Sequence, residues 1–149
     1  MKSTLRLFAY FCLISGLLPL SGCFSQPGLP GLVKVTGNVT YDGSPVTFGN
    51  VMFFPDGDRG QTGSGEIASD GSYTVATSPS SIGLLPGKYK VSVISQLSSA
   101  GMKDDGTPIP AKTAIPRKYG KITTSGLELD VPVDGSPIVL DIAMTGKID

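Results

Sequence analysis

The chain has 149 residues, and its 12 Lys and Arg residues balance its 12 Asp and Glu residues, so its formal net charge is zero at neutral pH. No long run of Lys or Arg occurs, which argues against a nucleic-acid partner. Histidine is absent and only two cysteines occur. The composition therefore predicts no Ser-His-Asp or Cys-His nucleophile and no zinc site of nitrogen and sulfur ligands.

The first 22 residues have the pattern of an export signal. Lys2 and Arg6 provide a positive start, and an almost entirely apolar run of 12 residues follows over 7–18. A membrane-spanning helix needs about 20 such residues, so the run is typical of a signal-peptide core. We therefore expect residues 1–22 to be removed from the mature protein.

The sequence Leu-Ser-Gly-Cys at 20–23 resembles the lipobox of bacterial lipoprotein precursors. The resemblance implies cleavage between Gly22 and Cys23 and a diacylglyceryl group on the Cys23 thiol. Two acyl chains hold a protein firmly to a bilayer, so we expect membrane anchoring outside the cytoplasm, on the periplasmic face or the cell surface. Phe24 stands where Asp signals inner-membrane retention in some bacteria, which favours the outer membrane. A secreted protein with a chance cysteine is the alternative.

Residues 23–32 are rich in Pro and Gly and are expected to form a flexible tether. Beyond them, period-two alternation of apolar and polar residues predicts seven strands, over 33–41, 51–54, 65–68, 72–77, 88–95, 127–133 and 138–144. Asp-Gly pairs at 42–43, 70–71 and 134–135 predict tight turns between strands. Residues 33–149 are thus expected to fold as one all-β domain, an antiparallel seven-stranded β-sandwich.

Several segments, in the right order, resemble carboxypeptidase regulatory-like domains. They lie at 36–46, 50–55, 69–73 and 84–91, and those at 115–119 and 124–127 resemble small lipoprotein versions from planctomycete-type bacteria. The resemblance covers nearly all of 33–144 and implies a transthyretin-like, or prealbumin-like, sandwich. It implies a non-catalytic domain, since this fold serves many roles and does not by itself define an activity.

The segment 96–124 is the best functional candidate, because it is too long for an ordinary connection and is the most basic part of the domain. We expect it to be an irregular contact loop. Its candidate contact residues are Lys103, Lys112, Arg117, Lys118, Tyr119 and Lys121. In the alternative interpretation it only covers a sheet edge, with Ile115 and Tyr119 as plugs.

Other carboxylates were weighed as sites. Two pairs are shorter than a dedicated calcium loop and are expected to be solvated, namely Asp56 with Asp58 and Asp104 with Asp105. Lys34, Glu66 and Asp141 have the residue types of the intramolecular crosslink found in collagen-adhesin repeats. Because Lys34 and Asp141 fall on the polar faces of their strands, we expect exposed charges instead.

The sequence therefore predicts a non-catalytic, membrane-anchored lipoprotein with a β-sandwich interaction module in the cell envelope. It predicts no metal site and no cofactor. The expected partners are the membrane, through the lipid on Cys23, and an envelope protein. A module that binds a small ligand or a carbohydrate is the alternative function.

Overall fold

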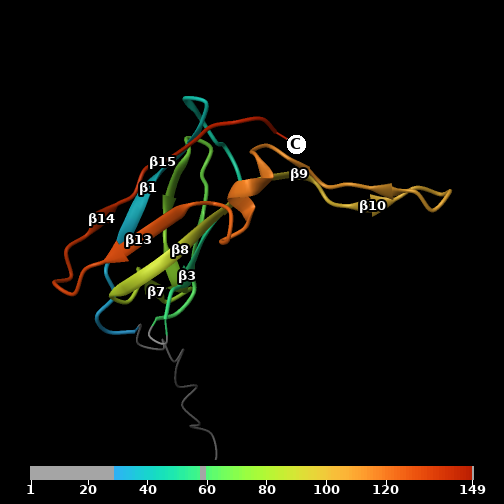
Figure 1. Cartoon of the computed structure of the whole chain (residues 1–149). Helices are drawn as coiled ribbons and strands as arrows, with labels where there is room; N and C mark the ends of the chain where they lie inside the picture. Colours follow the sequence, from blue (N-terminus) through green and yellow to red (C-terminus); the bar gives the residue numbers. More distant parts are fainter. Residues whose placement is uncertain (1–28, 58–59, 149) are drawn as a thin grey trace, which may run out of the picture.

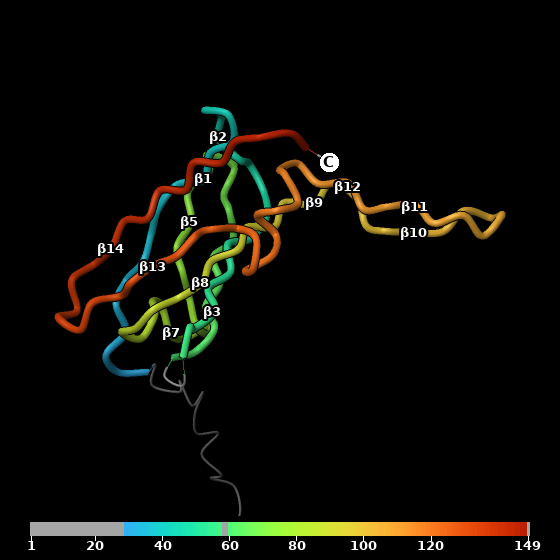
Figure 2. The backbone as a smooth tube through the Cα atoms, in the orientation of Figure 1, coloured from blue at the N-terminus to red at the C-terminus, as the bar shows by residue number. Residues whose placement is uncertain are grey.

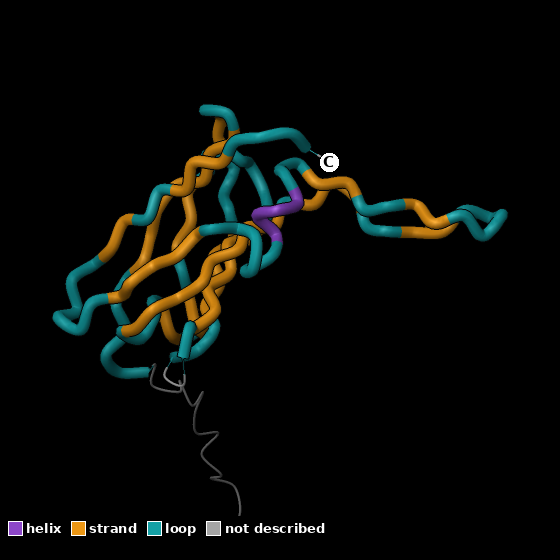
Figure 3. The backbone as a smooth tube through the Cα atoms, viewed as in Figure 1, coloured by secondary structure: helices purple, strands orange, loops and turns teal. Residues whose placement is uncertain are grey.

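The computed structural model describes residues 29–57 and 60–148 of the chain. The predicted signal peptide, Gly22 and Cys23 lie outside these residues. In the described part, strands form the regular structure apart from one short 3-10 helix, η1 (Arg117–Gly120), so the all-β prediction is confirmed (Figures 1 and 3). No helix among the described residues has the length and apolar character needed to cross a membrane.

The larger sheet has six strands, and each pairs antiparallel with its neighbour. Their order is β13 (Leu127–Val131), β8 (Gly87–Ile94), β3 (Asn50–Pro55), β4 (Gly63–Glu66), β6 (Ala76–Ser78) and β7 (Ser81–Ile82). The β3–β8 register runs from Asn50 opposite Ile94 to Pro55 opposite Tyr89. Inward positions carry mostly β-branched and aromatic side chains, which fit a half-buried pleated surface.

The second sheet is built around β1 (Val35–Tyr41). β1 pairs with β5 (Ser72–Thr74) along one edge and with β14 (Ile138–Val139) and β15 (Ile142–Met144) along the other. The short β2 (Ser44–Pro45) folds back antiparallel on the end of β1. β14 and β15 run parallel to β1, so the expected antiparallel pairing is wrong for the last strand. Alternation reports which face of a strand is buried and not the direction of its neighbour.

One extended segment joins the two sheets. Its first half is β5, its second half is β6, and between them the N–H of Val75 donates to the carbonyl of Val35 at 2.9 Å. The sheets enclose a core in which the rings of Phe53 and Tyr73 lie 6.3 Å apart. The largest fully buried side chains are Tyr89, Phe53, Leu84, Ile115 and Met144, followed by Val33, Val35, Val39, Val51, Val75, Val91 and Val93.

The last strand is interrupted where it passes closest to Gly37. A Cβ on Gly37 would lie 1.9 Å from the carbonyl oxygen of Leu140, so a side chain there would push the strand away. The same oxygen accepts the Tyr73 hydroxyl at 2.7 Å, and the Asp141 carboxylate accepts the N–H of Asn38 at 2.9 Å. Side chains thus replace two hydrogen bonds that a regular ladder would make.

Residues 96–113 form a two-stranded arm that projects from the two sheets (Figures 1 and 2). Its strands are β9 (Gln96–Ser98), β10 (Gly101–Met102), β11 (Pro108–Ile109) and β12 (Lys112–Thr113). β9 pairs with β12 and β10 with β11, both antiparallel. The prediction of an irregular loop is therefore wrong over these residues. Neither face of the arm is buried, so its sequence lacks the alternation that would reveal strands.

The three predicted Asp-Gly turns are confirmed, and each contains a glycine with positive φ: 82° at Gly43, 88° at Gly71 and 77° at Gly135. Their surroundings differ. A Cβ on Gly71 would lie 2.9 Å from the carbonyl oxygen of Val39, whereas nothing lies within 4 Å of a Cβ on Gly135.

We expect Gly71→Ala to destabilise the domain more than the matched Gly135→Ala. At Gly135 the alanine adds backbone strain of about 1–2 kcal/mol. At Gly71 it adds the same strain and also a clash with β1. Urea unfolding of both variants measures the difference, and equal losses would contradict the argument from the clash.

Candidate functional site

The arm leaves the domain at the end of β8, and a second segment covers this end of the strand. β8 continues through Ser95 into β9, and the chain returning from the arm passes Ile115 before η1 packs on β8. Ser92 and Ser95 are only 2% and 1% exposed as a result, and Ile115 joins the core. The base of the arm is therefore built into the domain although the arm itself is solvated.

Tyr119 fixes η1 in place. Its ring is buried in the core, and its hydroxyl donates to the carbonyl of Thr145 and accepts the N–H of the same residue, both at 3.2 Å. The Thr145 N–H stabilises the phenolate form and so lowers the pKa of Tyr119. The prediction that Tyr119 belongs to a contact surface is therefore wrong. The interpretation that Ile115 and Tyr119 act as plugs describes both residues correctly.

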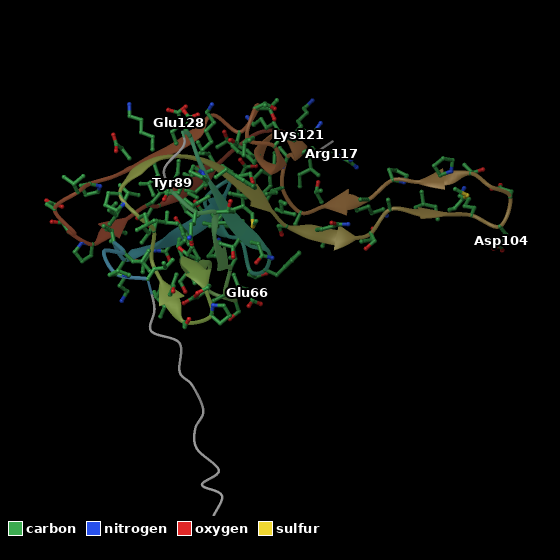
Figure 4. All side chains as sticks on the ribbon, turned by 90° about the horizontal axis from the view of Figure 1, so that it is seen from below. Glu66, Tyr89, Asp104, Arg117, Lys121 and Glu128 are labelled. Atoms are coloured by element: carbon green, nitrogen blue, oxygen red, sulfur yellow. The ribbon has the colours of Figure 1, made fainter. Side chains whose placement is uncertain are left out.

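The five predicted contact cations are all exposed, but they do not form one patch. Lys103 lies near the arm tip, beside Asp104, whereas Arg117 and Lys121 lie at the arm base (Figure 4). Arg117 donates from Nη2 to the carbonyl of Ala111, which ties η1 to the arm. The cations on β12, on η1 and directly after η1 are Lys112, Arg117, Lys118 and Lys121.

The arm carries exposed apolar side chains that the sequence interpretation did not single out. Leu97 is 62% exposed, Met102 71% and Ile109 39%. Ile109 pairs with Gly101 and Met102 with Pro108, so Met102 and Ile109 point to opposite faces of the ribbon. Three apolar residues scattered through a polar segment were the available signal, and their spacing indicated no element.

A pocket of about 290 Å³ lies where the arm meets the domain. It is lined by the end of β8, the segment that follows the arm, and the end of η1, with the residues Val93, Ile94, Ser95, Thr113, Ile115, Pro116, Arg117, Gly120 and Lys121. The hydroxyls of Ser95 and Thr113 are buried and make no hydrogen bond within the described part of the chain. Buried hydroxyls are nearly always hydrogen-bonded, so this pair marks the pocket as a candidate site.

A wider hollow of about 760 Å³ lies at the other end of β8, where Lys88 and Asp130 face each other across the β8–β13 ladder. Asp56 also lines it and forms an ion pair with Lys90 at 3.3 Å. All of these charges are largely solvated, and a surface ion pair of this kind stabilises little.

The carboxylates considered for calcium have other roles. Asp105 accepts the N–H of Thr107 at 2.9 Å in the arm-tip turn, and the hydrogen bonds from Thr107 lower the pKa of that carboxyl. Asp58 lies outside the described residues. Within residues 29–57 and 60–148, no three His, Cys, Asp or Glu residues are grouped to hold a metal ion. Lys34, Glu66 and Asp141 are all exposed, as expected for surface charges.

No family model matches the chain, and no curated protein matches it. Among solved structures, the crystal structure of a 9R-lipoxygenase from Cyanothece PCC8801 is similar with a TM-score of 0.41 and 11% sequence identity. The match covers 96% of this chain and 20% of that protein, so the chain spans one fifth of its length. Similarity at this level does not assign a fold or a function.

We expect Tyr119→Ala to destabilise the domain by about 3–5 kcal/mol, because it removes a buried ring and leaves a cavity. Tyr119→Phe keeps the ring and loses only the hydroxyl's bonds to Thr145, which costs about 1 kcal/mol. Chemical denaturation measures both losses. An alanine variant as stable as the phenylalanine variant would show that the ring does not act as a plug.

Proposed function

We propose that this chain is an exported lipoprotein, held to a membrane by a diacylglyceryl group on Cys23, whose domain binds an envelope protein partner through the arm and catalyses no reaction. The lipobox-like segment at 20–23 supports the anchor, and Phe24 supports the outer membrane as its location. The exposed arm is the observation that carries the contact function.

We also infer that the domain is a seven-stranded sandwich of the transthyretin-like type, related to carboxypeptidase regulatory-like domains. Strands occur within or overlapping all seven expected ranges, when β5 with β6 and β14 with β15 are each taken as one. The resembling segments also fit their positions, since 69–73 is the turn into β5 and 84–91 leads into β8.

The position of the chain's N-terminal side supports an arm that faces away from the membrane. The N–H of Leu29 donates to the Ser81 hydroxyl at 3.2 Å, and Val33 pairs with Leu84 just before β8 begins. The arm starts just after β8 ends, and the 8 residues of β8 span about 26 Å (Figure 2). Cys23 precedes Leu29 by six residues, a reach of about 20 Å at most. An anchor on Cys23 would thus hold the end opposite the arm near the bilayer.

Three features of the arm support a protein partner. A two-stranded ribbon is only marginally stable alone in water. Its outer edges pair with no other strand among the described residues, and such edges are templates for strand addition. Its apolar side chains face solvent on both faces. A partner that adds a strand or covers these side chains would remove all three costs.

Cys23→Ala should abolish labelling with radioactive palmitate and either release the protein from membranes or leave an uncleaved precursor. Cys12→Ala is the matched control, because Cys12 lies inside the expected signal peptide and should not affect labelling. Labelling and membrane fractionation of both variants in cells test the anchor. Unchanged labelling of the Cys23 variant would refute it.

Serine substitutions at Leu97, Met102 and Ile109 together should leave the melting temperature nearly unchanged, because these side chains are already exposed. They should reduce crosslinking of the chain to its envelope partner in cells. The control is Val133→Ser with Val139→Ser, which removes apolar side chains that are 90% and 70% exposed and lie away from the arm. If both triple and control variants keep the same crosslinked species, the arm is not the contact surface.

A further inference from the structure

We propose that the pocket at the arm base is a binding site for a small organic carboxylate. The pocket combines two buried hydroxyls without partners, two cations and apolar walls. This inference does not rest on the lipid anchor or on the partner of the arm, since every residue it uses lies in the described domain.

The two hydroxyls are the donors that such a ligand needs. Ser95 is only 1% exposed, and its carbonyl already accepts the N–H of Ala114 at 2.9 Å, so its hydroxyl is the polar group that remains unused. Thr113 stands on the opposite strand of the arm base, and its buried hydroxyl also lacks a partner in the described chain. Each hydroxyl has one O–H to donate, and a carboxylate has two oxygens that accept.

The charge of the lining selects an anion. Arg117 and Lys121 both contribute to it, and none of its nine residues is acidic (Figure 4). Arg117 is tied to the carbonyl of Ala111, so its cation is positioned before any ligand arrives. A group that is already ordered costs less entropy on binding, and hydrogen bonds between ionised partners are stronger than neutral ones.

The walls select an organic anion over an inorganic one. Val93 and Ile115 are buried core residues that reach the pocket, and Pro116 is buried beside them. Phosphate or sulfate would leave this apolar surface uncovered. The volume of about 290 Å³ corresponds to roughly ten water-sized groups, which is the size of benzoate.

The test uses isothermal titration of the full chain, purified in detergent, with benzoate as the probe. Benzamide has the same shape without the charge, and inorganic phosphate has charge without an apolar body. We expect saturable binding of benzoate that is at least tenfold tighter than binding of either control. Absence of saturable benzoate binding, or equal binding of benzamide, would overturn the proposal.

Variants then locate the site. Thr113→Val and Ser95→Ala should each weaken benzoate binding about tenfold or more, and Lys121→Gln about fivefold. Thr113→Val should keep or raise the melting temperature, because it removes a buried hydroxyl without a partner. Lys103→Gln, at the far end of the arm, is the charge-matched control and should bind like the unmodified chain. Equal binding by all variants would place benzoate elsewhere and refute the site.

A last arm of the experiment separates two sources of the carboxylate. Alanyl-phenylalanine presents the same group at the end of a peptide. Tighter binding of the dipeptide than of benzoate would identify a peptide C-terminus as the ligand, and weaker binding would identify a free acid. Hydrogen exchange at residues 93–95 and 113–121 should slow with whichever probe binds, and no slowing there would count against the site.

Discussion

The burial of Ile115 and Tyr119 against the end of β8 is the contact on which both the arm and the pocket depend. The chain returning from the arm contributes these two side chains to the core, and the Tyr119 hydroxyl links them to Thr145 at the end of β15. Burying an aromatic and an isoleucine side chain stabilises by several kcal/mol. That energy holds the base of a ribbon whose outer part buries little and would be marginal alone.

The same contact shapes the pocket. Because η1 packs on β8, the hydroxyls of Ser95 and Thr113 are taken out of water, and Arg117 is brought to the carbonyl of Ala111. A side chain that donates from one strand and a cation that comes from the covering helix thus meet at one place. The proposed partner surface and the proposed carboxylate site share this base, yet the arm residues Leu97 and Met102 lie outside the pocket lining. Variants can therefore separate the two roles.

The two sheets are linked by a segment that belongs to both and by one close approach of the backbone. β5 and β6 continue into each other through Val75, which keeps one edge of each sheet in contact. At the opposite edge of β1, the missing side chain of Gly37 lets the Leu140 carbonyl come near and bind the Tyr73 hydroxyl. These are constraints of shape, and Phe53 and Tyr73 fill the space between the sheets.

The sequence by itself determined the all-β class, the positions of the strands that bury one face, and the Asp-Gly turns. In these places the signal is local, because period two and positive φ at glycines such as Gly43 depend only on neighbouring residues. It could not show that β14 and β15 run parallel to β1, or that 96–113 forms a ribbon with both faces in water. It also could not bring Ser95 and Thr113 to one pocket, since two serine-like hydroxyls far apart in the chain carry no pattern. Only the tertiary structure decided these features, because they arise from contacts between segments whose separation leaves no trace in local composition.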